Sequence, residues 1–303
     1  MLLMNVEQSG VTLGWSSPVL ARLQSANSTI PTTSNEGAWI ASALPLASLF
    51  ATGFSALSMH YLGRKFTIAI TAFPYIISWI IIALASTTTE LIIARAIAGI
   101  ASAFTYTVTP VYLGEISPDN IRGGIGLCIS VVGNIGTLWI YCIGTIPELW
   151  LSSLLSALPI FGVLFFYLWL PESPYFLLEN NRKEEAVNAL KRLRNKDNVE
   201  DEIKQMELTI SRNSDQNIFK ELITDPSHRR ALMIALGTVT FAQFTGGITF
   251  LFYAHLIFKR AGNVSANLMS ILKAVMQLLT SIGSAYVVDN VASHECYNFN
   301  VMI

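Results

Sequence analysis

Arg95 is the charged residue whose position most needs an explanation, because it lies inside a long apolar stretch. A charge within a membrane span costs on the order of 3 kcal/mol or more, so it needs a partner or a water-filled cavity. Further along the same stretch, Glu115 and Arg122 bracket a short turn and could lock helix ends together in one conformation. The alternative is that each charge extends to the nearest interface and has no part in function.

Two short motifs place charges beside turn residues. In Gly63-Arg64-Lys65 the glycine permits a tight turn, and the paired cations can bind helix C-termini or carboxylates on neighbouring helices. The same tripeptide could equally be ordinary positive charge on the cytoplasmic side of a membrane. Pro171-Glu172-Ser173-Pro174 is by itself a helix-exit turn, and its place between apolar stretches and a charged segment makes it informative.

Patterns typical of catalysis and metal binding are absent from the sequence. It contains no nucleophile–base pair, HExxH, Cys/His cluster or phosphate loop, so a membrane enzyme has little support. The three cysteines are most simply small buried hydrophobes. A net charge of −1 lacks the basic surface that a nucleic-acid partner requires. We therefore expect no enzyme activity, cofactor, metal or nucleic acid.

The composition predicts that the elements carrying these residues lie in a lipid bilayer. Of 303 residues, 52% are hydrophobic and 13% charged, with a mean hydropathy of +0.50. Soluble domains carry about 25% charged residues. The charges are also segregated, since 11 of 19 Lys+Arg and 12 of 20 Asp+Glu lie between Pro171 and Arg230. The remaining chain cannot form a water-soluble surface, whereas it can form one that faces lipid.

About 20 predominantly apolar residues are needed to span a bilayer as a helix, and eight segments approach this requirement. They are residues 3–22, 37–59, 66–86, 91–114, 124–146, 149–170, 231–258 and 267–288. The first is the weakest, because Glu7 and Gln8 interrupt it. The sequence thus predicts an all-α integral membrane protein. Its predicted domains are a six-helix bundle over 1–170, a cytoplasmic amphipathic helical linker over 171–230, two helices over 231–289, and a divergent tail over 290–303.

Positive charges in the short loops predict the orientation. Arg64 and Arg122 follow the second and fourth spans, which places their loops, the N-terminus and the linker in the cytoplasm. Lys259-Arg260 stands against this rule. The loops on the opposite side contain the sequons Asn27-Ser28-Thr29 and Asn263-Val264-Ser265, so Asn27 and Asn263 are predicted glycosylation sites. We expect a multi-pass protein of the plasma membrane.

The charged linker predicts two amphipathic helices. The first runs from Arg182 to Arg194, and the second carries Ile203, Met206 and Ile210 on one stripe. Their apolar stripes need something to cover, and the cytoplasmic ends of the membrane helices are the nearest candidate. Six spans, a charged connector and further spans are the organisation of transporters built from twin halves.

Together these motifs resemble the sugar porter family of the major facilitator superfamily. The resemblance covers residues 10–289 and includes the Gly-Arg-Lys loop, Arg95 with Gly99, the run from Pro110 to Gly123, and Pro-Glu-Ser-Pro. The phrases over residues 13–18 and 36–40 are most similar to the insect trehalose-transporter-like branch. The resemblance implies a twelve-helix carrier whose two six-helix halves enclose a sugar near mid-membrane and work by alternating access.

The resemblance also implies two sets of functional residues. Charged residues would form a latch that holds the outward-open state, namely Arg64, Lys65, Arg95, Glu115, Arg122, Glu172 and Asp289. Polar residues would bind the sugar, namely Gln243, Gln277, Ser130, Thr245, Thr249 and Tyr253. The family binds hydroxyls with side-chain amides, which donate and accept together. Ala242, Ile248 and Ser130 replace usual amides, so the pocket is predicted to be less polar, and any candidate could instead serve interhelical packing. His60 stands where the family usually has an acidic residue, which weakens the latch prediction.

The residue facing Arg95 bears on energy coupling. A proton-driven relative would need a titratable carboxylate in the first span opposite this arginine. The matching position is Ser16, and Glu7 lies about two and a half turns earlier, ~13–14 Å along the helix axis. The sequence therefore favours facilitated, uncoupled transport over proton-coupled symport.

The resemblance further implies that four helices of the second half are missing, because the sequence departs from the family after Asp289. Two hypotheses remain. The chain is a facilitative carrier of trehalose or a hexose, completed by a missing C-terminal half or by self-association. Alternatively, it is a non-transporting relative that acts as a sugar sensor or assembly partner.

Overall fold

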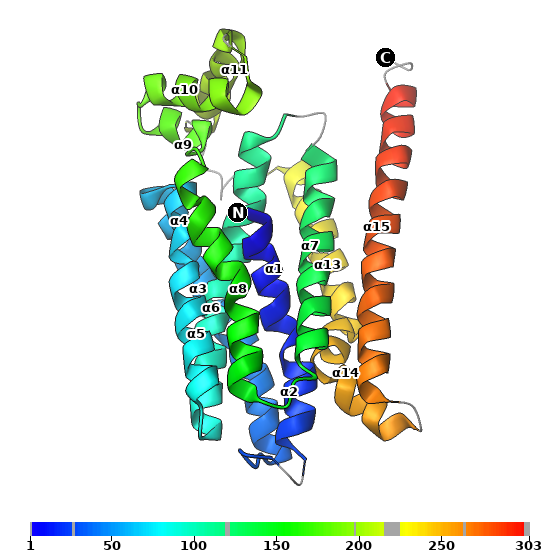
Figure 1. Ribbon diagram of the computed structural model, residues 1–303. Coiled ribbons are helices and arrows are strands. Elements are labelled where there is room, and N and C mark those ends of the chain that lie inside the picture. Colours follow the sequence, from blue (N-terminus) through cyan, green and yellow to red (C-terminus); the bar gives the residue numbers. More distant parts are fainter. Residues whose placement is uncertain are drawn as a thin grey trace. The chain divides into compact units, whose positions relative to one another are not determined.

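The computed structural model describes residues 2–25, 28–118, 122–196, 198–214, 225–262 and 265–299. All regular secondary structure in these ranges is helical (Figure 1). The chain divides into two compact units, Met1–Leu170 with Phe252–Ile303, and Pro171–Leu251.

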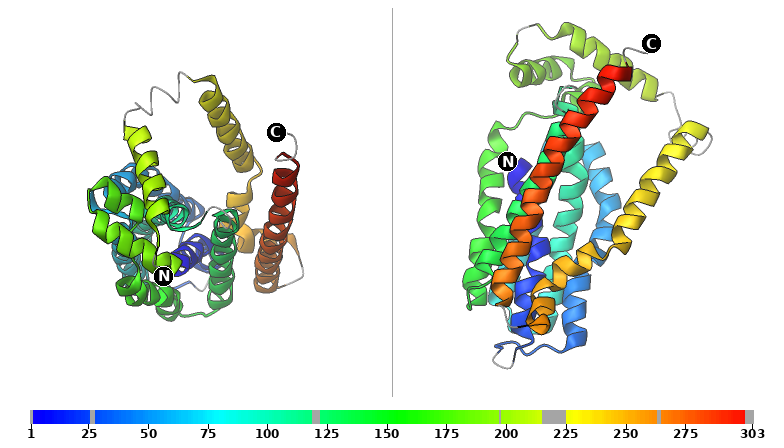
Figure 2. Two further views of the ribbon diagram at one scale, coloured as in Figure 1. Left: turned by 90° about the horizontal axis from the view of Figure 1, so that it is seen from above. Right: turned by 90° about the vertical axis from the view of Figure 1, so that its right-hand side faces the viewer.

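The first unit contains the helical segments of the N-terminal bundle and the last described helix. They are α1 (Leu2–Gly14), α2 (Ser16–Leu23), α3 (Ser34–Leu62), α4 (Arg64–Ile70), α5 (Ala72–Leu84), α6 (Thr88–Ile116), α7 (Arg122–Ile143), α8 (Leu149–Phe166), a 3₁₀ turn (Tyr167–Trp169) and α15 (Ala266–Phe299). Helix α1 packs against α6, α7 and α8, while α3 packs against α6. Helix α15 lies beside α7 (Figure 2).

The second unit contains four described helices in full. They are α9 (Pro174–Glu179), α10 (Lys183–Arg194), α11 (Glu200–Ser214) and α13 (Pro226–Phe244). Helix α14 (Gly247–Ala261) crosses the boundary between the units.

Seven described helical stretches are long and apolar enough to cross a membrane. They are Ser34–Leu62, Arg64–Leu84, Thr88–Ile116, Gly124–Ile143, Leu149–Trp169, His228–Ala261 and Ala266–Ser284. The predicted first span is instead divided at Trp15 into α1 and α2. Pro18 explains the division, because proline lacks an N–H and its ring crowds the carbonyl four residues earlier, at Gly14. Trp15 itself keeps helical dihedrals, with a φ of −53° and a ψ of −37°, so residues 3–22 form two helical segments joined at one residue, as α4 and α5 are joined at Thr71.

Two helices begin with matching caps. In α3 the Thr33 side chain accepts a hydrogen bond from the backbone of Glu36, whose carboxylate accepts from the Thr33 N–H in return. Thr87 and Glu90 repeat this capping box at the start of α6. Each box satisfies backbone donors that a helix N-terminus would otherwise leave unpaired.

Glycines allow the helices of the bundle to cross closely. A Cβ at Gly99 of α6 would lie 2.3 Å from the Leu44 oxygen of α3, and the Ser48 hydroxyl donates to the Gly99 oxygen at 2.8 Å. A Cβ at Gly10 of α1 would meet the Gly133 oxygen of α7 at 2.0 Å. Small residues at crossings are the usual means of packing helices in membranes, where lipid removes the hydrophobic driving force between helices.

The linker helices form a core of their own. Leu177, Leu190, Ile203 and Met206 are among the buried residues that α9, α10 and α11 share. Ion pairs between Arg194 and Glu202 and between Lys183 and Glu207, both 2.7 Å, join α10 to α11. The apolar stripes of the linker helices therefore cover one another. This differs from our expectation that they would cover the cytoplasmic ends of the membrane helices.

The predicted span over residues 231–258 is divided between α13 and α14. Gly246 has a φ of +72°, which a residue with a side chain rarely adopts. Its N–H still donates to the Gln243 oxygen at 3.1 Å. The glycine therefore bends the chain within one apolar stretch.

Candidate functional site

A chain of polar side chains connects α7 with α15. Lys273 Nζ donates to Gln277 Oε1 at 2.6 Å, and Gln277 Nε2 donates to Asn134 Oδ1 at 2.8 Å. Asn134 Nδ2 in turn donates to Ser281 Oγ at 2.5 Å. Lys273, Gln277 and Ser281 follow one another at four-residue intervals, which places them on one face of α15. We call Lys273, Gln277, Asn134 and Ser281 the amide cluster.

The amide cluster contains one residue of the predicted sugar-binding set and three that sequence reasoning missed. Gln277 was predicted, whereas Asn134, Lys273 and Ser281 were not. Asn134 lies one helical turn after Ser130, the position where the family usually has glutamine. Ser130 itself is exposed on α7. The four-residue spacing from Ser130 was a signal that could have revealed Asn134.

The other predicted sugar-binding residues are placed elsewhere. Gln243, Thr245 and Thr249 belong to the second unit and are exposed. Thr245 Oγ1 donates to the Ala242 oxygen at 2.7 Å, beside the bend at Gly246. Tyr253, in the first unit, is half-buried on α14. Their sugar-binding role remains a prediction.

Arg95, on α6, is completely buried, and its side chain contacts α1 and the start of α2. Its Nη1 donates to the Thr12 oxygen at 2.6 Å, and its Nη2 donates to Ser16 Oγ at 2.9 Å. The guanidinium carbon lies 5.1 Å from the centre of the Trp15 ring, within range of a cation–π contact. Arg95 makes no ion pair with any residue that the structure describes. Its charge is thus balanced by neutral acceptors and an aromatic face.

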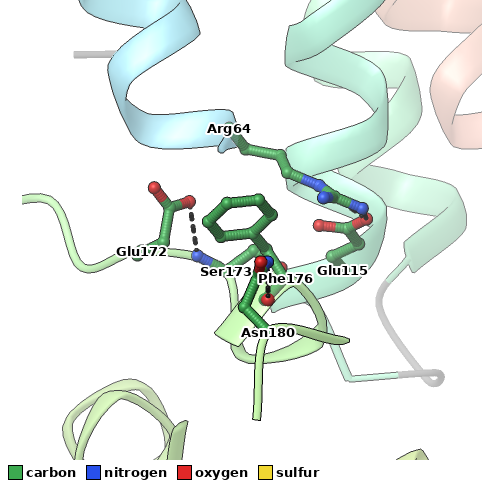
Figure 3. A network of polar contacts seen from close by, with 6 residues as sticks. All are labelled: Arg64, Glu115, Glu172, Ser173, Phe176 and Asn180. Carbon is green, nitrogen blue, oxygen red and sulfur yellow. Dashed lines mark hydrogen bonds and ion pairs between the residues drawn. The ribbon is translucent and has the colours of Figure 1, made fainter. Parts of the chain in front are cut away.

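Arg64 and Glu115 are the predicted latch residues that the structure brings together. Arg64 Nη2 lies 2.6 Å from Glu115 Oε1, and Nε donates to the same oxygen at 3.1 Å (Figure 3). The pair joins the first residue of α4 to the last turn of α6. The side chains are only 11% and 16% exposed, so solvent screens the pair incompletely. Lys65 Nζ lies 4.8 Å over the Tyr167 ring.

Two of the remaining latch residues, Glu172 and Arg95, have described side chains. Glu172 Oε1 accepts from the Ser173 N–H at 2.8 Å (Figure 3). Arg95 lies on the same helix as Glu115 but twenty residues earlier, roughly 30 Å along the axis, so it does not belong to the same cluster. Four predicted side chains lie outside the described residues. They are Arg122 and Asp289 of the latch, and the sequon residues Asn27 and Asn263.

A second buried polar group lies inside the bundle and was also not predicted. Asn5 Nδ2 donates to Thr71 Oγ1 at 2.9 Å, and Thr105 Oγ1 donates to Asn5 Oδ1 at 2.9 Å. The Tyr75 hydroxyl lies 3.3 Å from Thr105 Oγ1. These groups satisfy one another within α1, α5 and α6, so we interpret them as interhelical packing.

Comparison with protein families identifies the chain. The family model described as sugar (and other) transporter matches residues 10–301. The chain belongs to this family of transporters. Solved structures of the xylose transporter XylE share its fold. The proton:xylose symporter bound to 6-bromo-6-deoxy-D-glucose superposes with a TM-score of 0.79 at 18% identity, over 95% of this chain and 68% of that one. The inward-open form of XylE from E. coli gives 0.69 at 18% identity, over 95% of this chain and 67% of that one.

Curated members of the sugar transporter family include similar insect proteins. The chain is 32% identical to facilitated trehalose transporter Tret1 of Anopheles gambiae, over 92% of its own length and 36% of that protein. Its identity to Tret1 of Bombyx mori is 34%, over 92% of this chain and 55% of that protein. The chain thus spans about a third to a half of these relatives. The predicted resemblance, the all-helical major facilitator fold and the multi-pass membrane character are confirmed.

Proposed function

We propose that this chain acts in facilitative transport of a sugar, trehalose or a hexose, across the plasma membrane by alternating access. The observation that carries the proposal is the amide cluster. Its Asn134 and Gln277 side chains join two membrane helices, and amides can donate to and accept from sugar hydroxyls together. A sugar could exchange its hydroxyls for the bonds that now run between α7 and α15.

The contact between Ser16 and Arg95 supports uncoupled transport. A symporter of the kind considered above would release Arg95 by protonating a carboxylate opposite it. Here that position is occupied by a hydroxyl, which accepts a hydrogen bond from Arg95 and does not titrate in the physiological range. The flux would then follow the sugar gradient alone.

The ion pair between Arg64 and Glu115 supports the latch proposal. Alternating access requires two packings that differ by a few kcal/mol, which a small number of ion pairs can bias. In the proposed topology this end of the bundle, the N-terminus and the 171–230 linker face the cytoplasm. Asn27 and Asn263 would carry glycans on the opposite side.

A second candidate function is a sugar sensor or assembly partner that does not transport. Ala242 and Ile248 favour it, because they replace amides that the resemblance leads one to expect in the sugar site.

Uptake of radiolabelled trehalose and glucose into oocytes expressing the chain tests the proposal. We expect saturable uptake that is insensitive to external pH and whose apparent affinity falls about 5- to 30-fold in Gln277→Ala. Gln243→Ala tests the sugar-binding role predicted for Gln243, which lies in the second unit. Gln205→Ala, at an exposed position of α11, is the matched control and should transport normally. Surface-delivered protein that moves neither sugar, but binds one of them, would favour the sensor.

A further inference from the structure

Lys273 is the only charged residue between Ala266 and Ser284, a stretch of α15 long and apolar enough to cross a membrane. An ionisable side chain at such a position is costly, and in membrane proteins it usually marks a pathway or a site for a charged partner. The sugar transport proposed above assigns no task to this cation.

The direction of the Lys273 side chain argues against simple snorkelling. The nearer end of the span is Ala266, seven residues before Lys273. Helical side chains normally lean toward the N-terminus of their helix, which here would carry the ammonium back to that end. Instead Nζ donates to Gln277 Oε1 at 2.6 Å, one turn further into the span. The charge is directed toward the interior of the span and the amide cluster.

The surroundings of the ammonium suit an anion beside a sugar. Nζ lies 5.8 Å from the centre of the Tyr141 ring on α7, at the outer limit of a cation–π contact. Its acceptor Gln277 is the residue that bonds Asn134. A cation and two amides thus converge from α7 and α15.

We propose that Lys273 makes this protein prefer sugars that carry an anionic group, a carboxylate or a phosphate. The ammonium binds the anion, while Asn134 and Gln277 bind neighbouring hydroxyls. This inference rests on the proposed function insofar as the amide cluster is the sugar site. Hydrogen bonds between ionised groups are roughly twice as strong as neutral ones, so an anionic sugar gains over its neutral counterpart.

Equilibrium binding to the purified full chain in detergent tests the inference. The probes are radiolabelled D-glucose, D-glucuronate and glucose 6-phosphate. We expect at least one of the anionic sugars to bind about tenfold or more tightly than glucose, with an advantage that shrinks as salt is raised. Binding of glucuronate alone identifies a carboxylate, and binding of glucose 6-phosphate alone identifies a phosphate. Equal affinity for all three sugars, or no binding of either anionic sugar, would overturn the inference.

Variants locate the effect at Lys273. Lys273→Gln should remove the preference for the anionic sugar, and Lys273→Arg should keep it. Lys204→Gln, at an exposed position of α11, is the matched control and should leave the preference unchanged. A preference that survives in a folded Lys273→Gln protein would refute the assignment. If that variant does not fold, the comparison of wild type with Lys273→Arg and the salt dependence still decide.

The two proposals fail in different ways. Binding of an anionic sugar without uptake of any sugar would contradict the proposed transport and leave the preference intact. Uptake of trehalose or glucose, with no binding advantage for either anionic sugar, would contradict the preference and leave the transport intact.

Discussion

Ser16 Oγ accepts a 2.9 Å hydrogen bond from Arg95 Nη2, so a hydroxyl occupies the position where a proton-coupled carrier would need a carboxylate. Replacing it by an acid should create a proton-sensitive step. In Ser16→Asp the ionised carboxylate would pair with the buried guanidinium, and protonation would release it. We expect sugar uptake by this variant to rise about tenfold as external pH falls through the carboxylate's pKa, the change that one pKa unit of coupling allows.

Uptake measured between about pH 3.5 and 8 checks this prediction, because that range includes the ordinary pKa of an aspartate, about 3.9. Ser16→Asn, which has nearly the same shape and no charge, should remain as insensitive to pH as the wild type. Identical pH profiles for Ser16→Asp and wild type would show that Arg95 takes no part in gating.

The Arg64–Glu115 pair should contribute to stability, since removing one partner leaves the other charge largely buried. We expect Glu115→Gln to lower the free energy of unfolding by about 1–3 kcal/mol. Thermal unfolding in detergent measures the change. The double variant Arg64→Gln/Glu115→Gln should lose less than the sum of the two single variants, because the two residues are in contact. Strictly additive losses would mean that the pair has no coupling energy.

Gly99 should be sensitive to the smallest possible enlargement. In an ordinary helix, replacing glycine by alanine gains up to about 1 kcal/mol. At Gly99 the new methyl would lie 2.3 Å from the Leu44 backbone oxygen, so α3 and α6 must separate, at a cost of about 1–3 kcal/mol. Gly53→Ala on α3, where no atom lies within 4 Å of the added carbon, is the control and should be neutral or stabilising. Equal melting temperatures for Gly99→Ala and Gly53→Ala would contradict the close crossing.

Asn134 should matter for sugar affinity as much as Gln277. Each loses a hydrogen-bonding partner when the other is truncated, so either alanine variant should weaken binding by about 1–2 kcal/mol. The double variant should be little worse than the single ones, because the two amides act together. Equilibrium sugar binding to the three variants provides the measurement. Unchanged affinity in Asn134→Ala would exclude this asparagine from the sugar site.

The contact between Ser16 and Arg95 could be anticipated from sequence because it depends on motif positions in two early spans. The spacing from Ser130 could have placed Asn134 on the same helix face. The contacts of Asn134 and Lys273 could not be anticipated, because periodicity shows which residues share a helix face but not which neighbouring helix that face meets. The bonds from Gln277 to Asn134 and from Lys273 to Gln277 exist because α15 packs on α7. Arg95 was grouped with Glu115 because both belong to the same set of charged motifs, although twenty residues separate them along α6.

Local backbone chemistry decided the helix boundaries that sequence reasoning missed. By hydropathy, residues 3–22 and 231–258 are continuous apolar stretches. Pro18 divides the first, and Gly246, with its positive φ, divides the second. Both residues were visible in the sequence, but proline and glycine are also tolerated inside membrane helices. Their effect therefore depends on the packing around them.

The core shared by α9, α10 and α11 is built from residues close together in sequence, between Leu177 and Met206. Contacts of such short range form quickly, because little loop entropy is lost in closing them. During synthesis this segment leaves the ribosome after α8 and before α13. It is expected to fold while the later helices are still being made. The helices before this segment would then assemble earlier than the helices after it.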